Sequence, residues 1–195
     1  METNKEIEDQ IRKTWFKNHV ATYEDHGELK VLQWRKPDTS VYYVRYVFDG
    51  NKMYVSGDTG EAVFCFTEKV SLHRLARYDI GYFESKLKAY HEDRRDFNSD
   101  KAIKRLREWL KEIKKDGAEY DHDDMKELFE DVRECRSVSD LAFVINSHDF
   151  IGDLEPDYCE WMYGIGQEIP WRIRGYLVGL KMALEQLKDP LEISD

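Results

Sequence analysis

The sequence predicts an α+β protein with an N-terminal helix, a four-stranded antiparallel meander sheet and a mainly helical C-terminal half. Three observations predict this class. Apolar residues recur at helical spacing before residue 20, β-branched and aromatic runs alternate with tight turns between residues 29 and 67, and helical spacing returns from residue 71. A chain of 195 residues can bury a core as one domain or as two small, closely packed domains.

The N-terminal helix is expected over residues 3–19, where Ile7, Ile11, Trp15 and Phe16 share one apolar face. Four runs with strand composition follow, at residues 29–34, 41–48, 53–55 and 62–66. Turn residues separate them at positions 37–38, 49–51 and 57–60. Connections this short join neighbouring antiparallel strands, so a meander is predicted.

The second half of the chain shows helical spacing and helix-capping residues. Ser71 and Asp79 are candidate caps for two helices, the second of which carries Leu87 on its inner face. Further helices are expected from residues 99–100 to 117, over 121–135, over 137–147, and from 170 to about 187. We therefore expect residues 1–90 to hold the sheet and the first helices. Residues 91–195 would form an acidic helical region packed on them as one compact unit.

The composition excludes several classes of protein. No apolar run approaches the roughly 18 residues of a membrane span, and the first residues lack the apolar stretch of a signal peptide. Cys65, Cys135 and Cys159 form no C-x-x-C pair, which favours free thiols in a reducing compartment. We expect a cytoplasmic protein with no cofactor and no membrane partner.

The net charge of −10 is concentrated in one part of the chain. Residues 1–90 carry 14 basic and 14 acidic side chains, whereas residues 91–195 carry 16 basic and 26 acidic ones. Within residues 116–160 there are 15 acidic side chains and three basic ones. Such a segment repels nucleic acid and attracts basic protein surfaces.

Three stretches carry a resemblance to a known group of proteins. They are residues 54–64 (YVSGDTGEAVF), 78–86 (YDIGYFESK) and 161–167 (WMYGIGQ). Together they resemble an uncharacterised protein family of Firmicutes phages, prophages and mobile elements. Small accessory proteins of such elements often antagonise host defence, and some inhibit CRISPR effectors. The resemblance therefore implies an origin and a class of function, without catalytic residues.

Each segment that resembles a catalytic motif has a simpler structural interpretation. A phosphate-binding loop needs a Lys followed by Ser or Thr at the start of a helix. The glycine-rich segment 56–60 has no such Lys and precedes a strand, so it indicates a hairpin turn. His122 lies among Asp121, Asp123 and Asp124, a set that could bind a divalent ion if the segment were a loop. Acids at this position equally favour the start of a helix.

Two groups of residues are candidates for partner binding. The acidic group can act as a solvated face or as a surface that competes with nucleic acid for a basic groove. The second group, near residue 171, can serve core packing with Tyr176 or a partner contact. The candidates are Asp121, Asp123, Asp124, Glu127, Glu130, Asp131, Glu134, Trp171, Arg172 and Arg174.

The sequence thus favours a non-enzymatic, phage- or prophage-encoded inhibitor of a host defence nuclease. The expected target is a CRISPR effector of the Cas9 type, bound in the host cytoplasm through an acidic surface that mimics nucleic acid. Two alternatives stay open. One is a metal-dependent nuclease or hydrolase that uses His122 with Asp121, Asp123 or Asp124. The other is a regulatory or replication accessory protein of a mobile element.

Overall fold

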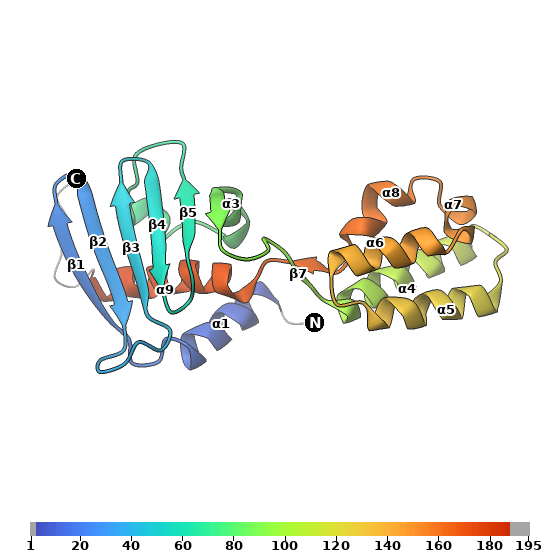
Figure 1. Cartoon of the computed structure of the whole chain (residues 1–195), viewed down its shortest axis with the longest axis horizontal. Coiled ribbons are helices and arrows are strands. Elements are labelled where there is room, and N and C mark those ends of the chain that lie inside the picture. The colour runs from blue at the N-terminus through green and yellow to red at the C-terminus, as the bar shows by residue number, and fades with distance from the viewer. Residues whose placement is uncertain (1–2, 188–195) are drawn as a thin grey trace. The chain divides into compact units, whose positions relative to one another are not determined.

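The computed structural model describes residues 3–187 (Figure 1). The predicted α+β class is confirmed, with an N-terminal helix, an antiparallel sheet and a helical C-terminal half. The sheet has six strands in the order β1-β2-β3-β4-β5-β6, each antiparallel to the next. These are β1 (Val20–His26), β2 (Leu29–Arg35), β3 (Val44–Asp49), β4 (Lys52–Gly57), β5 (Ala62–Cys65) and β6 (Leu87–Tyr90).

The chain divides into two compact units. Unit 1 contains the described residues up to Arg94 and from Pro170 onward, and unit 2 is Arg95–Ile169. Unit 2 is therefore inserted between β6 and the last helix, α9 (Trp171–Leu187). The expected helical region of residues 91–195 is divided by this arrangement, because α9 belongs to the unit that holds the sheet.

The prediction of four strands was wrong, because two strands lack a clear strand pattern. β1 is an edge strand in which no residue is buried, and only Ala21 and Tyr23 are half-buried before a polar end, so its strand pattern in the sequence is weak. β6 has one buried residue, Leu87, whose spacing in the sequence predicted a position on a helix. The helix in question, α3 (Ile80–Ser85), is capped by Asp79 as predicted but ends before Leu87, which pairs with Phe64 of β5.

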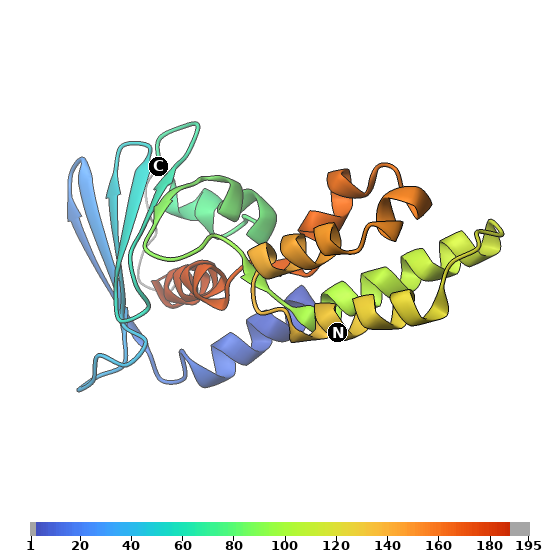
Figure 2. The ribbon, with the colours of Figure 1, turned by 45° about the vertical axis from the view of Figure 1, so that its right-hand side comes forward.

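One face of the sheet packs on α9 (Figure 2). Leu32, Tyr46, Val55 and Ala62 pair across four strands, and all four are buried on this face. The hydroxyl of Tyr46 donates a 2.8 Å hydrogen bond to the backbone carbonyl of Tyr176 in α9. The core of unit 1 is therefore closed by a helix that lies far along the chain from the strands.

Two glycines on α9 allow its neighbours to approach closely. A Cβ atom on Gly175 would lie 2.7 Å from the Trp15 ring, and one on Gly179 would lie 2.8 Å from the Tyr46 hydroxyl. Helix α1 (Asn4–Thr14) buries Ile7 and Ile11 and is joined to α9 by a bidentate ion pair between Arg12 and Glu185, at 3.0 and 3.1 Å. Two short helices, α2 (Leu72–Leu75) and α3, also contact α9.

Unit 2 is built mainly from helices around its own core. Its elements are β7 (Asp96–Phe97), α4 (Ser99–Lys115), α5 (His122–Glu134), α6 (Val138–Ser147), α7 (Phe150–Leu154), α8 (Tyr158–Trp161), a 3-10 turn η1 (Met162–Gly164) and β8 (Gln167–Glu168). The core includes Leu106 and Trp109 of α4, Leu128 and Val132 of α5, and Leu141 of α6. The short strands β7 and β8 pair with each other, which brings the two ends of the insertion together.

No helix within residues 3–187 is both long and apolar enough to cross a membrane.

His19 lies in an aromatic cluster beneath the start of β1. Its side chain packs against Phe16 and Trp34, with ring centroids 5.2 and 5.5 Å away, and its Nε2 lies 3.2 Å from the carbonyl oxygen of Tyr42. Only 3% of the residue is exposed. Burial lowers the pKa of His19 below its ordinary value of 6.5.

We predict that His19 makes the stability of unit 1 sensitive to acid. Well above pH 6.5 the imidazole is neutral in both states, and as the pH falls through 6.5 the unfolded chain takes up a proton before the folded one does. The free energy of unfolding therefore falls as the pH decreases from about 6.5 toward 5. Chemical denaturation at several pH values measures the free energy of unfolding. This free energy should fall less steeply with decreasing pH for His19→Gln than for the wild type. The same change at the exposed His73 should leave the wild-type decline intact; equal slopes for all three proteins would contradict the prediction.

The turn between β4 and β5 requires glycine at its start. Gly57 has φ +136°, and a Cβ atom there would collide with the backbone carbonyl oxygen of Tyr43. We predict that Gly57→Ala destabilises the protein by roughly 3 kcal/mol or more. Gly50 in the preceding turn has φ +57° with open space around it, so Gly50→Ala should cost only about 1 kcal/mol. Denaturant titration of the two variants tests this, and similar losses would exclude the backbone collision as the cause.

Candidate functional site

Helix α5 presents a continuous row of carboxylates to solvent. Asp123, Glu127, Glu130 and Glu134 are all exposed and follow one another at steps of four, three and four residues. Because each residue of a helix advances by about 100°, these four side chains lie within about 60° of one another around the axis. We call these four residues the acidic stripe.

The other predicted acids of this segment have different positions. Asp121 caps α5, and its carboxylate accepts hydrogen bonds from the backbone N–H groups of Asp123 and Asp124, at 2.7 and 3.2 Å. Asp124 is exposed on the neighbouring side of the helix. Asp131 is only partly exposed, and its carboxylate lies 3.1 Å from Nε2 of His148. The structure therefore brings together four of the seven predicted acids and gives Asp121 and Asp131 local partners.

Asp123 lies in the first turn of α5, where the helix dipole favours a carboxylate, but the rest of the acidic stripe does not stabilise the helix. Like charges three or four residues apart on a helix repel one another, each pair costing about 0.2–0.5 kcal/mol. Glu134 also lies at the C-terminal end of α5, where the helix dipole disfavours a carboxylate. Within the stripe, only Glu130 has an ion pair among the described residues, at 3.7 Å from Lys126. Its carboxylates are thus available to a partner in solution.

Charge in unit 2 is segregated by element. The unit carries 11 basic and 20 acidic side chains, a balance of −9. Residues 99–115, which form α4, hold seven basic and three acidic side chains, whereas residues 116–169 hold three basic and 16 acidic ones. The negative potential therefore originates from α5 and the elements that follow it.

The second group of predicted binding residues lies in unit 1, on the first turns of α9. Arg174 is only 7% exposed, and its Nη1 donates a 2.9 Å hydrogen bond to the side-chain oxygen of Asn4. Trp171 is partly buried, with its ring centroid 6.3 Å from that of Trp15. These two side chains pack unit 1, so of this group only Arg172 is available on the surface.

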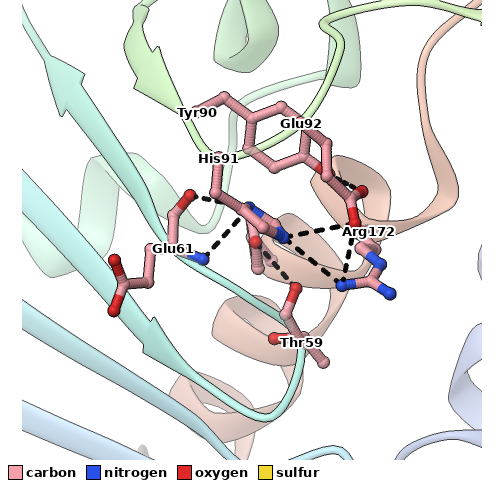
Figure 3. A network of polar contacts seen from close by, with 7 residues as sticks. Thr59, Glu61, Tyr90, His91, Glu92 and Arg172 are labelled. Atoms are coloured by element: carbon pink, nitrogen blue, oxygen red, sulfur yellow. Dashed lines mark hydrogen bonds and ion pairs between the residues drawn. The ribbon is translucent and has the colours of Figure 1, made fainter.

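Arg172 belongs to a polar network that links the end of β6 to α9 (Figure 3). Its Nη1 lies 3.4 Å from the Glu92 carboxylate and 3.4 Å from Nε2 of His91. The Glu92 carboxylate also accepts a hydrogen bond from the hydroxyl of Tyr90, at 3.3 Å. On the other side of the ring, Nδ1 of His91 faces the backbone N–H and carbonyl of Glu61, at 3.2 and 3.1 Å.

The residue types of this network resemble those of an acid–base catalytic site, but its side chains form hydrogen bonds and ion pairs with one another. The nearby Tyr176 hydroxyl donates to the carbonyl of Thr59 at 2.9 Å, and burial raises the pKa of Tyr176, so it keeps its proton. Glu92 lies two residues before the chain leaves unit 1, and Arg172 lies two residues after it returns. The network therefore joins the two places where the insertion meets unit 1. Because Arg172 is 80 positions from Glu92, no local pattern in the sequence indicates their pairing.

The residues that suggested metal chemistry do not assemble a metal site, and the described cysteines include a buried thiol, Cys135. Within the described part of the chain, no three His, Cys, Asp or Glu side chains are grouped so that they could hold a metal ion. The ring of His122 instead packs edge-on against Tyr120, with centroids 5.0 Å apart. Burial raises the pKa of the Cys135 thiol, which makes it a weaker nucleophile.

Comparisons of the chain with protein-family models, with curated proteins and with solved structures find no match. The features that bear on function are therefore the geometry and charge of the two units themselves.

Proposed function

We propose that this chain is a non-enzymatic inhibitor, encoded by a phage or prophage, that binds a host defence nuclease. The target that we propose is a CRISPR effector of the Cas9 type, whose basic nucleic-acid channel would accept the acidic stripe of α5. The observation that carries the proposal is the alignment of Asp123, Glu127, Glu130 and Glu134 on one exposed helix face. The resemblance of three sequence segments to a phage protein family supports the choice of target.

The spacing of the stripe suits competition with a nucleic acid. At 1.5 Å per residue, steps of three and four residues place successive carboxylates about 4.5 and 6 Å apart along the helix axis. Phosphates along one DNA strand advance by about 3.4 Å each. The axial spacing of the carboxylates is thus about 1.3 to 1.8 times that of the phosphates. A row of carboxylates on this scale can meet some of the same Lys and Arg side chains, and complementary charge accelerates association at low salt.

The primary experiment measures defence directly. Phage should plate efficiently on CRISPR-immune cells that express this protein and poorly on immune cells that lack it. In vitro, the purified protein should prevent a guide-loaded Cas9-type effector from binding labelled target DNA. Unchanged immunity across several effector types would overturn the proposed function. A protein that instead co-purifies with a partner from a mobile element would be a regulatory accessory.

We predict that removing three charges of the stripe weakens inhibition without harming the fold. The triple variant Glu127→Gln, Glu130→Gln and Glu134→Gln should bind the effector at least roughly tenfold more weakly, because three exposed ion pairs of about 0.5 kcal/mol each sum to about 1.5 kcal/mol. The dependence of the affinity on salt concentration should become shallower. Thermal unfolding should be unchanged or slightly raised, since like-charge repulsion is relieved.

A matched control separates the stripe from the overall charge. The control variant removes an equal number of negative charges from unit 1, through Asp9→Asn, Glu24→Gln and Glu28→Gln. This variant should inhibit like the wild type. If both triple variants lose affinity equally, net charge rather than the stripe governs binding, and the role assigned to the stripe is wrong.

A further inference from the structure

Unit 2 has an open groove along the junction of α4 and α5, with a volume of about 370 Å³. Four of its lining residues are cationic and two form a partly exposed apolar floor, and none of its lining residues is acidic. The cations are Arg107, Lys114, Lys126 and Arg133, and the floor residues are Leu110 and Phe129. The groove thus carries a charge opposite to that of unit 2 as a whole.

The cations of the groove are arranged in a regular way. On α4, Arg107 and Lys114 are seven residues apart, and on α5, Lys126 and Arg133 are also seven residues apart. Seven residues are two helical turns, or about 10 Å. Because α4 and α5 are consecutive helices joined by a short connection and packed side by side (Figure 1), they run antiparallel, and each end of the groove receives one cation from each helix.

These cations are largely free of internal partners. Among residues 3–187, neither Arg107 nor Arg133 has a carboxylate within ion-pair distance. Lys126 lies 3.7 Å from Glu130 in an exposed pair, and Lys114 lies 5.5 Å from the centre of the Tyr120 ring. Exposed pairs of this kind contribute little energy, so an incoming carboxylate can replace them.

The floor between the two cationic ends suits an apolar side chain. Leu110 and Phe129 are partly buried and rest on the core of the unit, so their outer surfaces face the groove. Two packed helices with an apolar groove are a common receptor for a third, amphipathic helix. A helix in this position would bury the floor and place its flanking residues beside the cations.

We propose that the α4–α5 groove binds an acidic amphipathic helix of another protein. The recognised segment would carry carboxylates at positions i and i+7, matching the two-turn spacing of the cations, and apolar side chains at i+3 and i+4 between them. All four positions lie on one side of a helix. This interaction is separate from the proposed action of the acidic stripe and does not depend on it.

The charges around the groove favour a short acidic helix over a nucleic acid. On α5, the acidic stripe follows the groove cations around the helix, about 40–120° from Lys126 and Arg133. A polyanion that extends beyond the groove would meet these carboxylates and the 16 acidic side chains of residues 116–169. A helix with two carboxylates meets only the cations at the groove ends.

The test uses the full chain and a defined probe. The probe is a fluorescent, hydrocarbon-stapled peptide of 15 residues, with Glu at i and i+7 and Leu at i+3 and i+4. A second peptide has Gln in place of both Glu residues, and a single-stranded DNA of 15 nucleotides serves as the polyanion. Fluorescence anisotropy measures each affinity, and NMR spectra show whether the signals of Leu110 and Phe129 shift on titration. Saturable binding of the acidic peptide, at least tenfold tighter than the neutral one, is expected.

Two charge variants locate the site. Arg107→Glu with Lys114→Glu should weaken binding of the acidic peptide at least tenfold. Lys104→Glu with Lys115→Glu makes the same charge change on exposed residues of α4 that do not line the groove, and should change the affinity less than threefold. Circular dichroism melts establish that both variants are folded. Equal losses in both variants, equal affinity for the two peptides, tighter binding of the DNA, or no shift of the groove signals would overturn the proposal.

Discussion

The packing of α9 against the sheet is the constraint on which unit 1 depends. Ten of the 17 residues of this helix are buried, far more than the single apolar stripe of a surface helix. It meets the sheet through Tyr46 and meets α1 through the Arg12–Glu185 pair. It also packs on the ring of Trp15, the residue that follows α1. An antiparallel sheet with one face in solvent needs one apolar cover for the other face, and α9 provides most of it. The six strands and three further helices of unit 1 are arranged around this helix.

In unit 2, helical periodicity sorts the charges that the sequence mixes. Along α5, acids and bases alternate irregularly, and the segment reads as simply acidic. When the segment forms a helix, Lys126 and Arg133 lie beside the groove, whereas Asp123 and Glu127 lie on the neighbouring face. One helix of 13 residues therefore presents two surfaces of opposite sign. The two surfaces meet at their shared border, where Lys126 lies 3.7 Å from Glu130.

The parts of the fold that the sequence predicted well are those with local signals. Asp79, Asp121 and Ser137 cap α3, α5 and α6, so the starts of these helices were predicted to within one residue. The edge strand β1 was missed because an exposed strand needs no apolar alternation, and β6 because a single buried Leu87 also fits a helix. The pairing of residues far apart in the chain leaves no local pattern. Hence neither the place of α9 in unit 1 nor the Glu92–Arg172 pair was predictable.

The candidate site was predictable to the same extent. The acidic stripe follows from spacing alone, once the helix is known, whereas the burial of Arg174 depends on Asn4 at the other end of the chain. An arginine among aromatic residues has the same sequence pattern whether it is buried or exposed. The α4–α5 groove was also not predictable, because its lining comes from two helices whose alignment the sequence does not specify.

The insertion of unit 2 has a consequence for the order of folding during synthesis. Residues 95–169 contain their own core, whereas the sheet lacks most of its cover until residues 170–187 emerge. The hydrogen bond from the Tyr46 hydroxyl to the Tyr176 carbonyl joins positions 130 residues apart, and closing so long a loop is costly in conformational entropy. Once β7 and β8 pair, however, the two ends of the insertion are held side by side. The effective loop between β6 and α9 is then much shorter than the 75 residues of the insertion. The entropic cost of packing α9 on the sheet is reduced accordingly.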